Sequence, residues 1–321
     1  MTLDTTKCIH CKKCTNSCVF LSKYDLDISD IDKLNELSYH CFLCGKCTEV
    51  CPVEIDGREV ILNMRRKEVM QNSGKVKGYG LLRVEKENYI FKNYKHTSGK
   101  SLLFPGCNFP SFYPETTKKL HSYLNKFEDI GIAYDCCGKP IGELGKDKAA
   151  GEIIDRLNRR FEKLGVTELI VVCPNCYYYL KPHINIRVVS IYKKLEELGC
   201  DLHMNESVLN TFIPCPDRYT KEWLREIQAF TDGELKEIPG VQCCGLGGLA
   251  SAKEPELAKG LLANLREKNL ANIYTYCGTC AGNMARADCG EVKHFLVELL
   301  QSNEKADCKK SIVNRAKTRL L

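Results

Sequence analysis

The sequence lacks every segment that would place the protein in a membrane or export it. None of its 321 residues lies in an apolar run near the roughly 18 residues of a membrane-spanning helix. Its start, from Met1 to Cys8, has no charged segment followed by an apolar one, which a secretory leader requires. We therefore expect a cytoplasmic protein that reaches the inner face of the cell membrane only through a partner.

A dinucleotide-binding motif is also absent. The glycine cluster Gly245-Leu246-Gly247-Gly248 follows two cysteines and does not open a strand–turn–helix unit. The sequence therefore predicts that neither flavin nor NAD binds to this chain, and that any flavin belongs to a partner.

An excess of positive over negative charge is found mainly in two segments of the chain. The net charge is +6, but residues 71–100 hold 7 Lys and Arg against 2 Asp and Glu, and residues 305–321 hold 6 against 1. These basic runs lack the interleaved aromatic side chains of a nucleic-acid-binding module, so we predict no nucleic-acid partner. They indicate either a solvated surface or contact with an acidic partner or an anionic membrane surface.

Cysteine, by contrast, is present in excess, with 21 residues. A disulfide scaffold explains this number poorly, because the chain is long enough to bury its own core and carries no secretory leader. Closely spaced thiols in a reducing compartment indicate bound metal instead.

Eight cysteines form two groups with the spacing C-x2-C-x2-C-x3-C, the second followed by Pro52. This is the spacing of bacterial ferredoxins that hold two [4Fe–4S] clusters, in which the fourth cysteine of each group ligates the other cluster. Zinc is the alternative, but zinc sites favour paired C-x2-C motifs. We assign to one cubane Cys8, Cys11, Cys14 and Cys51, and to the other Cys41, Cys44, Cys47 and Cys18.

The rest of the chain holds an internal repeat built on five cysteines. Each copy has a single cysteine, then Cys-Cys-Gly, then C-x2-C, and corresponding positions lie 104 to 108 residues apart. Zinc at one of the two copies and a disulfide are the alternatives to an iron–sulfur cluster in each. We expect these ten thiols to be metal ligands and catalytic groups: Cys107, Cys136, Cys137, Cys173 and Cys176 in the first copy, and Cys215, Cys243, Cys244, Cys277 and Cys280 in the second.

Each copy alternates short apolar runs with helical patterns, which indicates βαβ units and a mainly parallel sheet. The cysteines follow the expected strands, and ligands of open α/β sheets lie beyond the carboxyl ends of strands. The expected strands are 101–105, 132–134, 169–172, 209–213 and 273–276, and the expected helices are 148–164 and 255–270.

Taken together, these motifs resemble the catalytic subunits of heterodisulfide reductase, either the D-type subunit or fused C- and B-type subunits. The series Cys107, Cys136-Cys137-Gly138 and Cys173-Pro174-Asn175-Cys176 looks like the cysteine-rich CCG domain of that family. The two ferredoxin motifs, 22 residues apart, resemble its α-helical ferredoxin domain.

The resemblance implies an α/β protein of two CCG repeats related by a pseudo-twofold axis, with an N-terminal α-helical ferredoxin domain. It implies two cubane and two noncubane [4Fe–4S] clusters, and the reduction of a small-molecule disulfide such as the CoB–CoM heterodisulfide. Electrons would come from a flavoprotein or cytochrome b subunit. The alternatives are an electron-transfer subunit of a flavin dehydrogenase acting on glycerol 3-phosphate, glycolate or lactate, and a zinc-stabilised scaffold.

We expect four segments: a ferredoxin-type domain at 1–70, a linker at 71–98, and the two CCG domains at 99–206 and 207–321. Because duplication produces similar sites, we expect both cluster edges to face one shared crevice. Gly278 and Thr279 would leave more room beside the second cluster than the corresponding residues of the first copy.

Other residues admit two interpretations each. Cys200 and Cys289 suit small, partly buried side chains, and Cys308 suits the surface. The tyrosines Tyr177, Tyr178 and Tyr179 either pack a helix or line a substrate cleft. Histidines His183 and His294 either donate protons or have structural roles, and Lys139 and Lys253 either attract an anionic substrate or are solvated.

Overall fold

The computed structural model describes residues 1–320, and its N-terminal unit consists of short helices with their apolar sides turned inward. The longest, α5, begins after Asp56, whose carboxylate accepts a hydrogen bond from the backbone N of Glu59 and caps the helix. Leu34, Ile55 and Ile61 pack with several of the cysteines in one small core. The helices are α1 (Lys13–Ser17), α2 (Val19–Lys23), α3 (Ile31–Glu36), α4 (Lys46–Glu49) and α5 (Gly57–Gln71).

The first α/β unit is a five-stranded sheet in the order β1-β3-β2-β4-β5. Its strands are parallel except β1, which lies antiparallel on the edge beside β3. The strands are β1 (Asn93–His96), β2 (Ser101–Phe104), β3 (Ile130–Tyr134), β4 (Glu168–Val171) and β5 (Arg187–Ser190). The helices are α7 (Phe109–Phe112), α8 (Pro114–Leu124), α9 (Lys139–Gly142), α10 (Asp147–Leu164), α11 (Pro174–Leu180) and α12 (Ile191–Glu197).

The second α/β unit has a four-stranded parallel sheet in the order β7-β6-β8-β9. This order matches β3-β2-β4-β5, so the internal repeat of the sequence is also a repeat of topology. The strands are β6 (Val208–Thr211), β7 (Glu234–Glu237), β8 (Asn272–Thr275) and β9 (Glu291–His294). The helices are α13 (Glu222–Gln228), α14 (Pro255–Glu267), α15 (Gly278–Arg286), α16 (Phe295–Leu299) and α17 (Ser311–Lys317).

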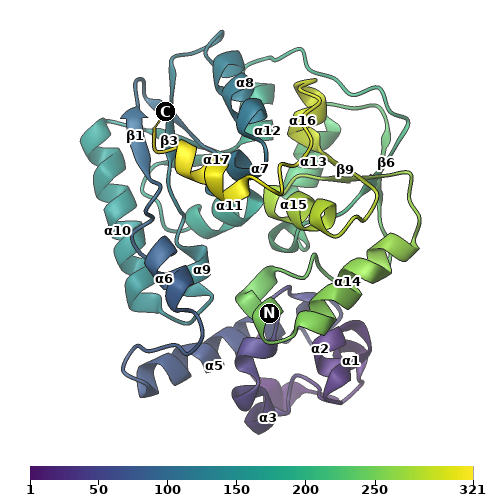
Figure 1. Cartoon of the computed structure of the whole chain (residues 1–321). Coiled ribbons are helices and arrows are strands. Elements are labelled where there is room, and N and C mark those ends of the chain that lie inside the picture. The colour runs from purple at the N-terminus through teal and green to yellow at the C-terminus, as the bar shows by residue number, and fades with distance from the viewer. Residues whose placement is uncertain (321) are drawn as a thin grey trace.

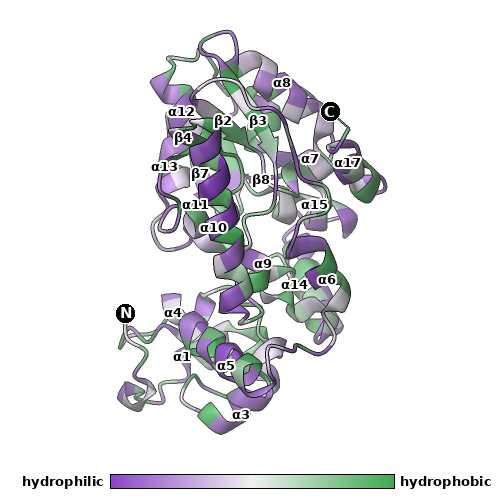
Figure 2. Cartoon of the chain, turned by 90° about the vertical axis from the view of Figure 1, so that its left-hand side faces the viewer, coloured by the Kyte–Doolittle hydropathy of each residue, from purple (hydrophilic) through white to green (hydrophobic). Residues whose placement is uncertain are grey.

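The mixed α/β fold with a helical N-terminal unit confirms the predicted fold class. Helix α10 covers its sheet with Ile153, Leu157 and Phe161 and turns polar residues to solvent (Figure 2). Strands β5, β7 and β9 were not among the expected strands. The segment expected to be a linker, 71–98, carries helix α6 (Gly80–Lys86) and contributes β1 to the first sheet.

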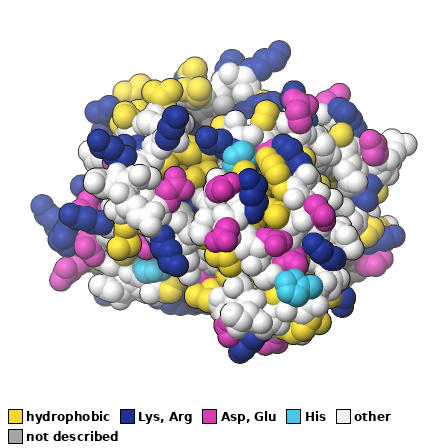
Figure 3. All heavy atoms as spheres, turned by 90° about the horizontal axis from the view of Figure 1, so that it is seen from below, with side chains coloured by type: hydrophobic (Ala, Val, Ile, Leu, Met, Phe, Trp, Pro, Cys, Tyr) yellow, Lys and Arg dark blue, Asp and Glu magenta, His cyan; other side chains and the backbone are white. Residues whose placement is uncertain are grey.

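The three units pack against one another, with the N-terminal unit below the two sheets (Figure 1). Arg65 of α5 is fully buried and donates hydrogen bonds to backbone carbonyls of all three units: Ser38 and Cys41, Glu143, and Gly248. Seen from below, basic and acidic side chains are interspersed over the surface (Figure 3). Among residues 1–320, no helix combines the length and hydropathy needed to cross a bilayer.

Candidate metal centres and active site

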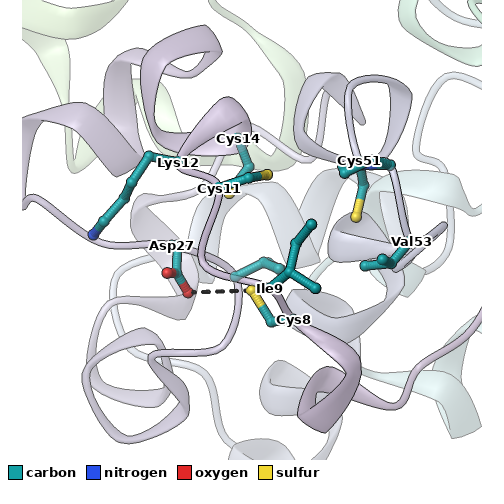
Figure 4. Close-up of a pocket in the computed structure, with 10 residues that line it drawn as sticks. Cys8, Ile9, Cys11, Lys12, Cys14, Asp27, Cys51 and Val53 are labelled. Carbon is teal, nitrogen blue, oxygen red and sulfur yellow. Dashed lines mark hydrogen bonds between the residues drawn. The ribbon is translucent and has the colours of Figure 1, made fainter.

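The first group of thiols, which we call the outer site, lies near the surface of the N-terminal unit. Cys8, Cys11, Cys14 and Cys51 line one small pocket (Figure 4). Left-handed backbone at His10 and Lys12 wraps the chain around it. The structure therefore brings together the four cysteines that the ferredoxin spacing assigns to one cubane.

A buried carboxylate stands beside the outer site. Asp27 is 2% exposed, lies 3.9 Å from Cys8 Sγ and pairs with His10 Nδ1 at 2.9 Å. Although burial opposes ionisation, hydrogen bonds from Ser29 and His10 lower the pKa of this carboxyl group. The outer site therefore has a negative charge next to one of its sulfurs.

The second group, the inner site, comprises Cys18, Cys41, Cys44 and Cys47. Burial, followed by the nearby thiols of Cys44 and Cys41, raises the pKa of Cys18 to about 12. The site is tightly enclosed, because a Cβ atom on Gly57 would stand 2.7 Å from Cys47 Sγ.

The donor sets of both sites fit iron–sulfur clusters. All 21 cysteines of the chain are free thiols, and the four expected donors of each site are sulfur. Soft thiolate donors at ferredoxin spacing suit [4Fe–4S] clusters. At the inner site, Gly57 also leaves no room for a side chain beside Cys47.

In the two repeats, the cysteines follow the carboxyl ends of parallel strands, as the sequence predicts. Cys107 follows β2, the pair Cys136-Cys137 follows β3, and Cys173 follows β4. In the second repeat, Cys215 follows β6 and Cys277 follows β8. Parallel strands thus collect thiols from distant sequence positions at one edge of each sheet.

Four thiols of the first repeat form a continuous chain of contacts. Cys136 hydrogen-bonds with Cys107 and with Cys137, and Cys137 also with Cys176. The hydrogen bonds from Cys136 and Cys176 lower the pKa of Cys137 to about 5. Close backbone approach is needed here too, because a Cβ on Gly106 would lie 3.1 Å from Cys176 Sγ.

The second repeat departs from this pattern because one of its thiols turns to the inner site. Cys244 hydrogen-bonds with Cys280, just as Cys137 does with Cys176 in the first repeat. Cys243, however, hydrogen-bonds with Cys44 of the N-terminal unit. That bond lowers the pKa of Cys44 to about 5. The inner site and the second repeat are therefore in direct contact through two sulfur atoms.

The C-x2-C motifs of the two repeats meet at their interface. Cys173 hydrogen-bonds with Cys277, and Asn175 Nδ2 lies 3.5 Å from Cys277 Sγ. The extra room expected beside the second motif stays a prediction. A Cβ on Gly278 would stand 3.1 Å from Phe109 Cα, and Thr279 Oγ1 accepts a hydrogen bond from Asn108 at 2.7 Å.

A cavity of about 430 Å³ lies between the two repeats. Helix α6 and the C-terminal helix α17 also line it, together with Leu43 of the N-terminal unit. Neither Cys243 nor Cys277 lines it. The cavity is thus shared by both repeats, and the cysteines that line it are Cys107, Cys136, Cys137, Cys173, Cys176, Cys215, Cys244 and Cys280.

Three cations line the cavity, and two of them come from segments outside the cysteine motifs. Lys86 is 5% exposed, and Arg315 and Lys86 both contact the Glu85 carboxylate, at 2.6 and 2.8 Å. Burial disfavours the charged ammonium, but the thiols of Cys107 and Cys136 raise the pKa of Lys86 above its ordinary value. Lys139, the third, pairs with Glu143. The sequence singled out Lys139 but missed Lys86 and Arg315.

The remaining candidates lie away from the cavity. His294 is buried against Phe109 and Tyr113, with ring centroids 4.9 and 5.5 Å away, and burial lowers its pKa to about 4. It accepts a hydrogen bond from Leu296 N and caps α16. His183 binds the carbonyl of Tyr179, and Lys253 does not line the cavity. These side chains therefore have structural or surface positions.

The three tyrosines after Cys176 connect helices and do not line the cavity. Tyr177 donates a hydrogen bond to Glu222 at 2.7 Å and Tyr178 donates one to Asp217. Both acceptors belong to the second repeat, so Tyr177 and Tyr178 join the two repeats.

Comparison with known proteins matches the family model described as a cysteine-rich domain at residues 101–181 and 198–285. A model described as a 4Fe–4S dicluster domain matches residues 7–55. These limits contain the ten repeat cysteines and the eight N-terminal ones.

Three relatives are similar to this chain over much or part of its length. One subunit of the fumarate reductase (CoM/CoB) of Methanothermobacter marburgensis is 24% identical, over 92% of this chain and 72% of its own length. An iron–sulfur protein of Methanococcus maripaludis is 25% identical, over 75% of this chain and 56% of its own length. The EtfAB:quinone oxidoreductase of Syntrophomonas wolfei is 28% identical, over 46% of this chain and 25% of its own length. Among solved structures, a glutamate racemase of Bacillus anthracis covers 67% of this chain and 85% of its own, with 9% identity and a TM-score of 0.34, too low to carry an argument.

Proposed function

The chain belongs to the family of proteins built on the cysteine-rich domain, and from this membership we propose that it is the iron–sulfur subunit of an oxidoreductase that reduces a small-molecule disulfide to two thiols. Its relative from Methanothermobacter marburgensis bears the name of a CoM/CoB fumarate reductase subunit. As the substrate we propose the mixed disulfide of the thiols CoM and CoB, or a related disulfide.

One observation carries this proposal: the cavity is lined by thiols of both repeats. Disulfide reduction takes two electrons and two protons, since one S–S bond breaks and two S–H bonds form. A cavity between two thiol-rich centres offers each sulfur of a disulfide a centre of its own. The cavity of about 430 Å³ is within the usual size of a small-molecule pocket, and clusters bound to its thiols would occupy part of it.

The residues of each centre suit a cluster, by the same reasoning as at the outer and inner sites. Cys107, Cys136, Cys137 and Cys176 would hold one in the first repeat, and Cys215, Cys244 and Cys280 would contribute to one in the second. When bound, iron–sulfur clusters supply single electrons and a site for sulfur ligation. The protein's share is to hold the substrate between the two centres.

The arrangement of the N-terminal unit supports a path for electrons. The outer site is near the surface, with Cys11 exposed; the inner site is buried and touches the second repeat through Cys44 and Cys243. We propose that an electron-donating flavoprotein or cytochrome b subunit docks at the outer site and that no flavin binds to this chain.

Metal analysis tests the cofactor content. Four [4Fe–4S] clusters correspond to about sixteen irons per chain. Protein purified without oxygen should approach this number, with an equal amount of acid-labile sulfide. About eight irons with stoichiometric zinc would show that the repeats hold zinc.

Cysteine variants test the shared cavity. Cys137→Ala and Cys244→Ala each remove one lining thiol, from the first and second repeat respectively. We expect both to abolish disulfide reduction while keeping the two ferredoxin cubanes. Cys289→Ala is the matched control, because Cys289 is buried and does not line the cavity. Near-full turnover in either cavity variant, with its cluster lost, would refute the need for both repeats.

A second function is favoured by the similarity to the EtfAB:quinone oxidoreductase. In that case the chain would only carry electrons away from a flavin dehydrogenase. The isolated chain would then accept electrons from an artificial donor but leave disulfides intact.

A further inference from the structure

The side chain of Gln242 leaves its own repeat and enters the N-terminal unit. It stands directly before the cysteine pair of the second repeat, yet its Oε1 accepts a hydrogen bond from Val19 N at 2.8 Å. Its Nε2 lies 3.5 Å from Cys18 Sγ and 3.4 Å from Cys44 Sγ. With 7% of its surface exposed, Gln242 uses its amide entirely at the inner site.

The orientation of this amide follows from its partners. A backbone N–H can only donate, so the atom facing Val19 must be the carbonyl oxygen. The NH₂ group then faces the two sulfurs, and the other arrangement would set two donors against each other. Gln242 is therefore a hydrogen-bond donor to two thiols of the same site.

The two ferredoxin sites differ in the charges around them. The outer site has the Asp27 carboxylate 3.9 Å from Cys8 Sγ and 2.9 Å from His10 Nδ1. Near the inner site stand two buried guanidinium groups: Arg65 donates to the carbonyl oxygen of Cys41 at 2.8 Å, and Arg218 donates to the carbonyl oxygen of Gln242. Both sites receive backbone N–H hydrogen bonds to their sulfurs, at Cys8 and Cys51 of the outer site and at Cys41 of the inner one. The sites differ in their side chains: a carboxylate, with His10 and Lys12 nearby, stands at the outer site, and the Gln242 amide donor with two guanidinium groups stands at the inner one.

Hydrogen bonds to ligand sulfurs and nearby positive charge favour the reduced form of an iron–sulfur cluster, whereas nearby negative charge disfavours it. We propose that Gln242 is a positioning residue that raises the reduction potential of the inner cluster, and that the inner cluster lies above the outer one. An electron accepted at the exposed outer site then moves downhill towards the second repeat. This inference rests on the proposed cluster content of the N-terminal unit and is independent of the disulfide substrate.

A potentiometric titration of the full-length protein, followed by electron paramagnetic resonance, tests the proposal. In Gln242→Met and Gln242→Glu, the inner cluster should be harder to reduce. We expect at least a tenfold rise in its oxidised-to-reduced ratio at fixed potential, about 59 mV for a one-electron couple. The outer cluster should not shift. Gln228→Met is the matched control, since the Gln228 amide donates to Thr231 and Gly233 carbonyls within the second repeat.

A substitution at the outer site assigns the signals. Asp27→Asn removes the negative charge beside Cys8 and should make only the outer cluster easier to reduce, which identifies its signal. Unchanged inner potentials in both Gln242 variants would overturn the proposal, as would a shift confined to the outer signal. Loss of the inner cluster from both variants would make Gln242 a purely structural residue and refute it as well. Absence of disulfide turnover in the unsubstituted protein would refute the proposed function and leave these potentials unaffected.

Discussion

Gly57 shows how closely single residues enclose the inner site. A Cβ atom there would lie 2.7 Å from Cys47 Sγ and 2.9 Å from Ile28 Cδ1. Gly57→Ala should displace Cys47 and lower the iron content by about four of about sixteen irons per chain, measured in anaerobically purified protein. Gly151→Ala in α10 is the control, because a Cβ there meets nothing within 4 Å. Full iron content in Gly57→Ala would contradict the assignment of Cys47 to this cluster.

At the residue scale, Glu226 on α13 should make the stability of the protein depend on pH. Burial raises its pKa to about 7, with Ser190 opposing the rise and Glu222 adding to it. Because the unfolded value is near 4.3, the native protein holds an extra proton between these pH values. Its contribution to stability is therefore present at low pH and is lost as the pH rises through about 7.

Glu226→Gln should remove the loss of stability that accompanies ionisation of Glu226. At pH 8 we expect the variant to be more stable than the unsubstituted protein by up to about 2 kcal/mol, and at pH 5 we expect little difference. Thermal unfolding of both proteins at the two pH values measures this. A stability difference that is the same at pH 5 and pH 8 would contradict the raised pKa.

At the scale of elements, apolar patterning predicted the central strands and the long helices. The expected helix 148–164 is α10 (Asp147–Leu164), and the expected strand 101–105 is β2 (Ser101–Phe104). Strand β7 escaped prediction because Glu234, Lys236 and Glu237 are exposed and give it no apolar run. Pairing with β6 makes it a strand, and such pairing is invisible in a local pattern.

Helix α17 is held to the first repeat by two hydrogen bonds with Ser111 that span about 200 positions, and a local contact with Asp307 adds to them. Asn314 Nδ2 donates to the Ser111 carbonyl at 3.2 Å and to Asp307 at 3.0 Å, and Ser111 Oγ donates to the Ser311 carbonyl at 2.7 Å. These contacts place Arg315 in the cavity wall. Sequence separation of this size explains why the role of the basic C-terminal segment was not predicted.

Asn314→Leu should detach this helix. It leaves a buried carbonyl without its donor, a cost of about 1–3 kcal/mol, and should speed proteolytic cleavage of the C-terminal segment while the rest of the chain resists. Ile312→Ala, which shortens a side chain that is 71% exposed, is the control. Equal cleavage rates for the two variants would show that Asn314 does not anchor α17.

At the scale of the whole molecule, Arg65 joins the three units through backbone carbonyls alone. Arg65→Met should cost about 3–5 kcal/mol, because several buried carbonyls lose a charged donor. We expect unfolding in denaturant to begin at lower concentration and to separate into more than one transition. Arg66→Met, which removes only partly exposed ion pairs with Glu59 and Asp147, should change stability by about 1 kcal/mol or less.

The cysteine spacing predicted which thiols meet at the outer site and at the inner site, because short local spacings bring them together. It did not predict that Cys243 lies against Cys44 or Cys173 against Cys277. The contacts between units could not be predicted in the same way. Cys44 meets Cys243, and Gln242 meets Cys18, only after the N-terminal unit and the second repeat pack. A single glutamine carries no local signal for such a contact, since the partners of Gln242 lie about 200 residues away.

Disulfide-dependent oxidation of a reduced viologen dye by the isolated, anaerobically prepared chain tests the central claim most directly. The account predicts that two dye molecules are oxidised and two thiols appear for each disulfide consumed. It also predicts that Cys137→Ala and Cys244→Ala lose this turnover. A chain that takes electrons from the dye into its clusters but forms no thiol with a panel of disulfides, the CoB–CoM heterodisulfide included, would contradict it.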